Sequence, residues 1–225
     1  MDDSASSANL SAVALFPLPN VVLFPQAVLP LHIFEHRYKQ MTADVLAGDR
    51  QLAMVLLKPG WEKLYHARPE IEPVVCVGTI LSHEQLADGN YNFLLQGHTR
   101  AKIVREIDEP HRPYRVAQLE HLCHKSAVPI ELGEQRRVLL EMFTSDIFAS
   151  TVLAGQFRKL LQSGLSVAEV ADLIAFNYFE DVLLKQSLLA ECDELRRVER
   201  TIAELQSLRG TIHPPKRSLP RPSDN

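Results

Sequence analysis

The sequence is poor in glycine and cysteine, and the arrangement of both excludes several classes of enzyme. Only 9 of the 225 residues are glycine, and none stands in G-x-G-x-x-G or G-x-x-x-x-G-K-[ST], the loops whose backbone amides wrap a nucleotide phosphate. The G-x-S-x-G turn of an elbow-type serine hydrolase is also absent. The 3 cysteines, Cys76, Cys123 and Cys192, form no C-x-x-C pair. We therefore expect reduced thiols in a cytoplasmic protein, with neither a disulfide framework nor a cysteine-based zinc site.

Charged residues are missing altogether from residues 4–34, so this segment has to be tested as a signal peptide or membrane span. The chain begins with Met1-Asp2-Asp3, which is acidic where a signal peptide needs a basic region. Four prolines, Pro17, Pro19, Pro25 and Pro30, interrupt any helix that could span a bilayer. We therefore expect no membrane association.

An excess of positive charge is also lacking. The chain holds 24 Lys and Arg against 28 Asp and Glu, a net charge of -4, which gives no long-range attraction for a phosphate backbone. The hydrophobic share of 46% and the charged share of 23% are typical of a globular protein with its own core. Nucleic-acid binding is therefore not favoured.

Strand signals fill the first half of the chain. Short apolar runs bounded by proline or turn residues predict about six strands before residue 125. Residues 87–90, Ala-Asp-Gly-Asn, predict a hairpin between two of these strands. From Phe34 to Val45 the apolar side chains recur at helical spacing, and we expect Gly48 to end this helix in the left-handed conformation.

Beyond Ser126 the apolar period changes to that of a helix. Ser166 and Glu169 form a capping box, because each side chain can satisfy an unpaired first-turn amide of a helix that starts there. A strand-rich half followed by a helical half predicts an α+β fold. We divide the chain into a disordered N-terminus (1–12), a β-rich subdomain (13–125), a helical subdomain (126–209) and a disordered basic tail (210–225).

Spaced segments of the chain match one family pattern in order. Residues 15–25 read LFPLPNVVLFP and residues 28–35 read VLPLHIFE. They are followed by LAGD (46–49), VGTI (77–80), DGNY (88–91), QGHTR (96–100), ADLIA (171–175) and KQSLL (185–189). Together these segments resemble the amino-terminal substrate-recognition domain of the Lon protease family, from about Leu15 to Leu208.

The resemblance implies a fold and a function. The fold is a PUA-like β pseudobarrel followed by a C-terminal α-helical bundle. The function is that of a docking element, which holds unfolded or tagged proteins for the machine behind it. The chain ends at Asn225, so we expect neither the ATPase nor the peptidase module, and no enzymatic activity. We expect no cofactor and no metal; a separate protease is a candidate partner, and homo-oligomerisation stays open.

Exposed apolar side chains would have to carry such docking, because an unfolded client offers hydrophobic side chains and free backbone rather than a fixed shape. The candidates are Leu18, Phe24, Phe34, Trp61 and Tyr65. For Phe34 we favour a core position at the start of the helix stripe. For Trp61 a contact role and a loop-anchoring role both stay open.

Two other functions remain as alternatives. RNA binding follows from the resemblance, because PUA-like barrels also occur in RNA-binding proteins, but the acidic body argues against it. A zinc hydrolase would use residues 32–36, which match H-x-x-E-H. The expected helix begins only at Phe34, so His32 and His36 would not share one turn, and Glu35 is better explained as a first-turn charge near the helix dipole.

Overall fold

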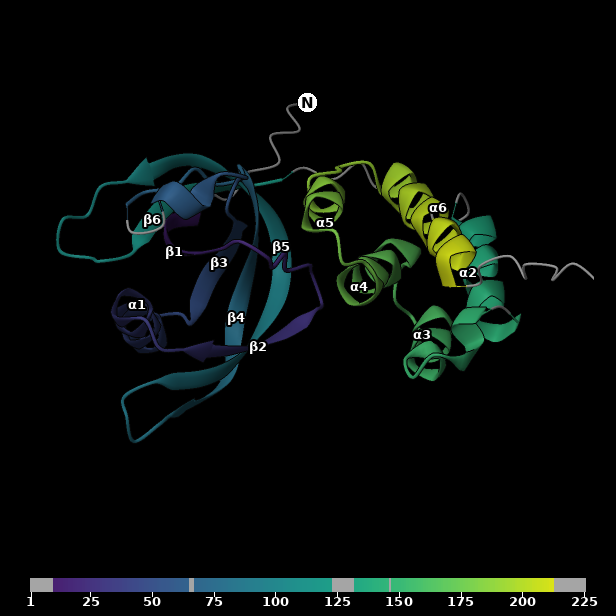
Figure 1. The fold of residues 1–225 in the computed structure, drawn as a ribbon, viewed down its shortest axis with the longest axis horizontal. Coiled ribbons are helices and arrows are strands. Elements are labelled where there is room, and N and C mark those ends of the chain that lie inside the picture. The colour runs from purple at the N-terminus through teal and green to yellow at the C-terminus, as the bar shows by residue number, and fades with distance from the viewer. Residues whose placement is uncertain (1–9, 65–66, 123–131, 146, 213–225) are drawn as a thin grey trace, which may run out of the picture.

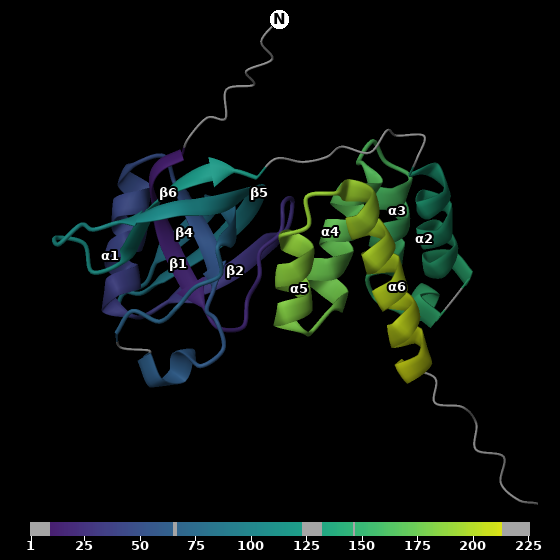
Figure 2. The ribbon, with the colours of Figure 1, turned by 90° about the horizontal axis from the view of Figure 1, so that it is seen from above.

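The computed structural model describes residues 10–64, 67–122, 132–145 and 147–212. A strand-rich half and a helical half lie side by side, with α4 and α5 next to the strands and α2, α3 and α6 farther away (Figures 1 and 2). The first half contains β1 (Leu10–Leu18), β2 (Val28–Ile33), α1 (His36–Ala47), β3 (Gln51–Leu56), η1 (Trp61–Leu64), β4 (Val74–Gln85), β5 (Tyr91–Ile107) and β6 (Arg115–His121). The second half contains α2 (Gly133–Ser145), η2 (Ile147–Ser150), α3 (Ala154–Leu161), α4 (Val167–Tyr178), α5 (Val182–Leu189) and α6 (Glu194–Ile212).

The strands form one 6-stranded sheet in the order β2-β5-β4-β3-β1-β6, and an additional β5–β6 pairing closes it into a barrel. The pairing of β1 with β3 is parallel, with α1 in the connection between them, and the other pairings are antiparallel. The long strand β5 makes closure feasible, because it pairs with β2 and β4 near its start and with β6 near its end. The α+β prediction, a β pseudobarrel followed by helices, is confirmed.

Two local predictions hold and one fails. Ser166 accepts from the Glu169 amide and Glu169 accepts from the Ser166 amide, so the capping box is present. The hairpin at residues 87–90 joins β4 to β5. Gly48, however, has φ -104°, so it is not a left-handed cap; Arg50 takes the positive φ of 63°.

The predicted segment boundaries shift at both ends of the chain. β1 begins at Leu10, inside the segment 1–12 that we expected to be disordered. α6 continues to Ile212, past the predicted start of the tail at residue 210. The rest of both end segments, and the boundary at residues 125–126, lie outside the described residues.

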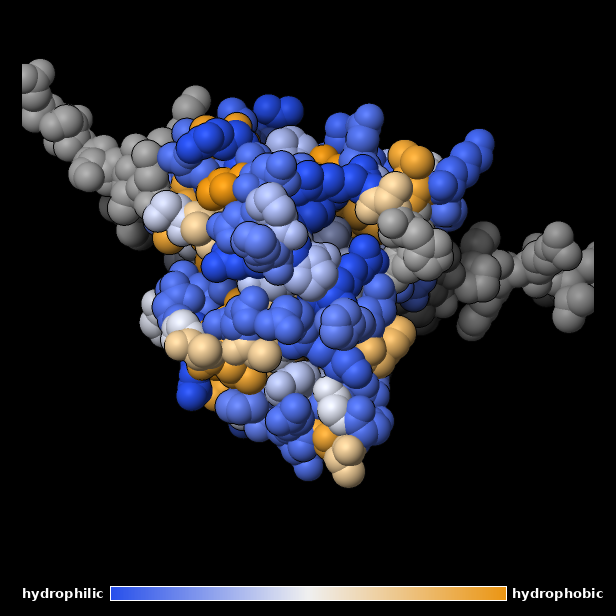
Figure 3. Space-filling view, turned by 90° about the vertical axis from the view of Figure 1, so that its left-hand side faces the viewer, coloured by the Kyte–Doolittle hydropathy of each residue, from blue (hydrophilic) through white to orange (hydrophobic). Residues whose placement is uncertain are grey.

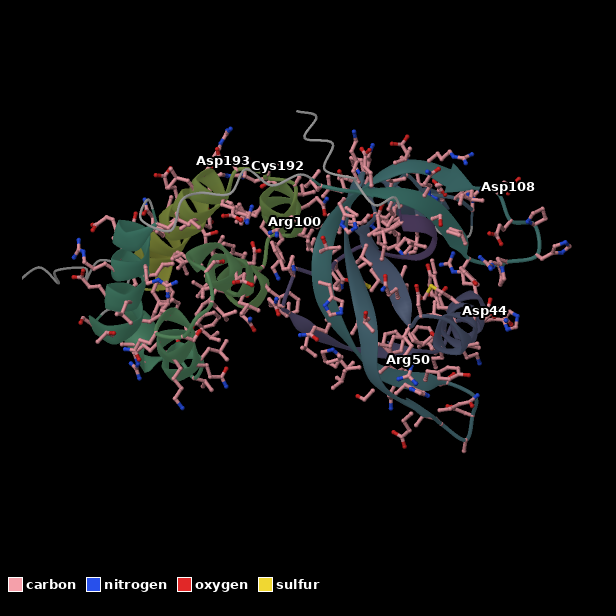
Figure 4. The ribbon with its side chains drawn as sticks, turned by 180° about the vertical axis from the view of Figure 1, so that it is seen from behind. Asp44, Arg50, Arg100, Asp108, Cys192 and Asp193 are labelled. Carbon is pink, nitrogen blue, oxygen red and sulfur yellow. The ribbon has the colours of Figure 1, made fainter. Side chains whose placement is uncertain are left out.

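A buried cluster of charges lies where the helices meet the sheet. Arg100 on β5 donates to Asp172 Oδ1 on α4 at 2.6 Å and to the carbonyl of Leu189 at the end of α5 at 3.0 Å. Arg197 on α6 lies 3.1 Å from the same Asp172 oxygen, and burial lowers the pKa of Arg197. All three charged side chains are buried, and Figure 4 shows Arg100 at the junction of strands and helices.

Within the described ranges, none of the helices is both long and apolar enough to cross a bilayer.

Candidate functional site

An exposed apolar surface lies on β2 and its neighbours. Val28, Pro30 and His32 alternate along β2, so they share its outer face. Opposite Pro30 on β5 stands Leu94, which points the same way because cross-strand partners share a face. We call the surface formed by Val28, Pro30, His32, Leu94 and the adjoining Phe34 the outer face.

A groove of about 430 Å³ crosses this face. It runs over three strands, because Leu94 on β5 pairs with Pro30 on β2 and with Ser82 on β4. Its lining is more apolar than polar, and a hydrogen bond of 2.7 Å between His32 Nδ1 and Asn92 Oδ1 fixes one wall. The remaining lining residues are Leu31, His83, Glu84 and Phe93. Apolar contact with a few fixed polar groups is the usual chemistry of a binding groove.

Backbone hydrogen bonds from the segment before β2 help to hold this strand against β5. Gly97 on β5 donates to the carbonyl of Ala27 and accepts from the amide of Gln26, both at 2.9 Å. A Cβ atom at Gly97 would come within 2.2 Å of the Phe24 carbonyl oxygen, so only glycine permits this approach. β2 pairs with β5 alone, and Pro30, which lacks an amide donor, is a residue type tolerated at such an edge.

The five residues predicted to bind clients lie in different environments. Phe34 is 64% exposed and precedes α1, so the favoured core interpretation of Phe34 is wrong. Phe24 is fully buried under the junction, so the expectation that it lines an exposed surface is also wrong. Leu18 is half-buried and packs against the core, and Trp61 is half-buried in η1. Tyr65 lies outside the described residues.

Of the four members of this set that the structure describes, only Phe34 lies at the outer face, where its ring stacks on that of His32 with centroids 6.1 Å apart. The sequence analysis missed Val28, Pro30 and Leu94. The alternation of Val28, Pro30 and His32 was the available signal, but it could not tell which side of the strand would be covered.

The H-x-x-E-H segment is split between two elements. His32 belongs to β2 and is bonded to Asn92, whereas His36 is the first residue of α1. Glu35 forms an ion pair with Arg37 at 3.0 Å. Across the part of the chain that the structure describes, no three His, Cys, Asp or Glu side chains are grouped so that they could hold a metal ion.

Comparison with known proteins gives one consistent family. A sequence model described as the ATP-dependent protease La (LON) substrate-binding domain matches residues 12–207. The Lon protease of Dictyoglomus thermophilum is 26% identical over 190 residues, covering 83% of this chain and 23% of that protein. The Lon protease of Azospirillum brasilense is 24% identical over 220 residues, covering 96% of this chain and 27% of that protein. The chain thus spans about a quarter of the length of these curated relatives.

Two solved structures have the same fold. A Lon N-terminal domain protein from Xanthomonas campestris superposes with a TM-score of 0.61 at 23% identity, covering 86% of this chain and 98% of that one. The N-terminal domain of the Mycobacterium avium complex Lon protease gives a TM-score of 0.65 at 16% identity, covering 85% and 96%. At these identities the likeness establishes the arrangement of strands and helices.

Proposed function

The chain belongs to the substrate-binding domain family of ATP-dependent protease La (LON), and from this membership we propose that it binds unfolded or tagged protein clients through the outer face. The observation that carries the proposal is that large apolar side chains on and beside the edge strand β2 are left uncovered. Phe34 is 64% exposed, Val28 41% and Leu94 39%. Exposed apolar groups gathered around a groove are typical of an interaction site.

The chemistry of an unfolded client fits this face. Such a chain offers apolar side chains in many sequences, so a receptor needs apolar contact area with little demand on shape. Burying one large apolar side chain contributes about 1.5–3 kcal/mol, part of which offsets the ordering of the client. Several weak contacts along the outer face would therefore give reversible binding to many sequences.

We propose further that the chain does this without catalysis of its own. The matched region of the family is its substrate-binding domain. Hydrolysis of a bound client would then fall to an ATP-dependent protease, and a Lon protease is the partner that family membership favours.

A binding assay with surface variants tests the client site. We expect the double variant Phe34→Ser/Leu94→Ser to bind a reduced, alkylated and permanently unfolded protein about tenfold more weakly than wild type, because two exposed contacts are lost. Val152→Ser is the matched control, since Val152 is 97% exposed but lies in the helical half. Fluorescence anisotropy of the labelled client measures both affinities.

Equal affinity of the double variant and the Val152→Ser control would contradict the proposal. In the same assay, a labelled RNA whose affinity falls steeply with salt would favour the RNA alternative instead. Thermal melts of each variant exclude unfolding as the cause of lost binding.

A further inference from the structure

The groove of the outer face has two unlike walls, because register partners on neighbouring strands place their side chains in rows. Pro30 on β2, Leu94 on β5 and Ser82 on β4 are such partners and form the first row. The second row, on the same side of the sheet, holds the partners two residues away along each strand, which are His32, Asn92 and Glu84. One wall of the groove is therefore mainly apolar and the other is polar.

Backbone forms the floor of the groove. The row between the two walls consists of Leu31, Phe93 and His83. Since side chains alternate along a strand, this row points to the opposite side of the sheet, where Phe93 is buried. Two residues along a strand separate the walls by about 7 Å, and β2 and β4 lie about 10 Å apart across β5. These dimensions suit one or two side chains of an extended polypeptide.

The β4 end of the groove carries an unpaired negative charge. Glu84 is exposed, and it is the only Asp, Glu, Lys or Arg among the described residues that line the groove. In the same wall His32 and Asn92 are bonded to each other at 2.7 Å, whereas no described residue forms a hydrogen bond or an ion pair with Glu84. Ser82, on the facing wall of the same strand, adds a hydroxyl oxygen that can accept a hydrogen bond. This end therefore suits a cation that donates hydrogen bonds.

The β2 end of the groove is apolar. Pro30 and Leu94 form its wall, and Phe34 is exposed directly after β2. Apolar surface is scarce elsewhere on this half, because the side that faces away from the helices shows apolar side chains only in small patches among hydrophilic ones (Figure 3). A segment lying along the groove thus meets an apolar wall at one end and a carboxylate at the other.

We infer that the groove favours client segments in which an apolar residue and an arginine or lysine stand two positions apart. The apolar side chain packs against Pro30 and Leu94, and the cationic group pairs with Glu84. Residues two positions apart in an extended chain point the same way about 7 Å apart, and the long basic side chain spans the remaining distance to β4. Its methylene stem lies along the apolar wall while its charged head stays in water at the exposed carboxylate.

The net charge of the chain, -4, attracts the same basic segments at longer range. The inference rests on client binding at the outer face and adds the class of sequence that this face selects.

Labelled peptides of equal length test the inference. They share a background of glycine and serine and carry Phe-Ser-Arg, Phe-Ser-Gln or Phe-Ser-Glu at the centre. We expect the arginine peptide to bind about threefold more tightly than the glutamine peptide, because an exposed ion pair contributes modestly, and the glutamate peptide to bind most weakly. Fluorescence anisotropy at low ionic strength measures the three affinities, since salt screens an exposed pair.

Charge reversal locates the cation. Glu84→Lys is expected to invert the order, so that the glutamate peptide binds about threefold more tightly than the arginine peptide, with the glutamine peptide within about twofold of its wild-type affinity. Glu199→Lys is the matched control, because Glu199 is exposed on α6 and its reversal changes the net charge by the same amount. This control should keep the wild-type order of the peptides.

Three results would overturn the inference: equal affinity of the three peptides for the wild type, the same change of order in Glu84→Lys and Glu199→Lys, or no binding of any peptide. The proposed function is tested separately, with the unfolded protein and Phe34→Ser/Leu94→Ser. If that variant loses the unfolded protein while the wild type binds the three peptides equally, client binding at the outer face stands and the preference for basic segments is wrong.

Discussion

At the scale of single residues, Asp172 has the most consequential environment. Its carboxylate lies within ion-pair distance of two buried guanidinium groups, those of Arg100 and Arg197. Withdrawing these charges from water costs several kcal/mol per ion, which only the paired geometry offsets. The three paired side chains therefore add little net stability. Removing one of them, however, would leave a buried charge without its partner and destabilise the fold.

Removing the charge of Asp172 tests this view. We expect Asp172→Asn to lower the free energy of unfolding by about 3–5 kcal/mol, because two buried cations would then face each other without a carboxylate. Urea denaturation measures the loss. Glu120→Gln, which breaks the exposed 3.7 Å pair with Lys102, is the control and should change stability by no more than about 0.5 kcal/mol. A similar small change in both variants would show that the cluster is not needed to hold the junction.

The residue scale is also where sequence reasoning was weakest. Arg100 and Asp172 stand 72 positions apart, and each was noted only within a segment of the family pattern. Charged residues are mostly exposed, so nothing in the sequence alone marks these two as buried partners. The prediction that Phe24 is exposed was wrong for a related reason. An apolar residue in a proline-rich segment has the same sequence pattern whether its side chain is buried or exposed.

At the scale of single elements, the sequence was sufficient to predict those features that depend only on neighbouring residues. The capping box of α4 and the turn between β4 and β5 depend on a few neighbouring residues, and both were predicted. The helix α1 ends before Gly48 as predicted, but the left-handed conformation expected of Gly48 is taken by Arg50 instead. The outer face was missed because its exposure depends on what packs over β2.

The cap of α4 gives a prediction at this scale. Ser166→Ala removes the oxygen that accepts from the Glu169 amide at 3.1 Å, and we expect a loss of about 1 kcal/mol in the free energy of unfolding. Ser207→Ala, on the exposed face of α6, is the control and should change stability by a few tenths of a kcal/mol at most. Urea denaturation of both variants decides the matter, and equal stabilities would mean that packing alone sets the start of α4.

At the scale of the whole molecule, the larger apolar core is shared by the two halves. The larger cluster of buried side chains runs from Phe16 and Met54 on the strands to Ile174 and Leu205 on the helices, and a second, smaller cluster lies within the strands. Polar contacts reinforce the larger cluster, since Gln186 on α5 donates to the carbonyl of Val74 on β4 at 2.9 Å. Neither half can therefore unfold without exposing apolar surface and unpaired polar groups of the other.

Such a molecule should unfold in one step, and the chain carries the probe for testing this. Its 1 tryptophan, Trp61, lies in η1 of the sheet half, so tryptophan fluorescence reports that half, while the helical band of far-UV circular dichroism reports mainly the other. We expect the two signals to change at the same urea concentration, because coincident transitions are the mark of two-state unfolding. Trp61→Phe should abolish the fluorescence change and leave the dichroism midpoint nearly unmoved. Two separate midpoints would mean that the junction is too weak to couple the halves, and the outer face would then belong to an independently folding sheet half.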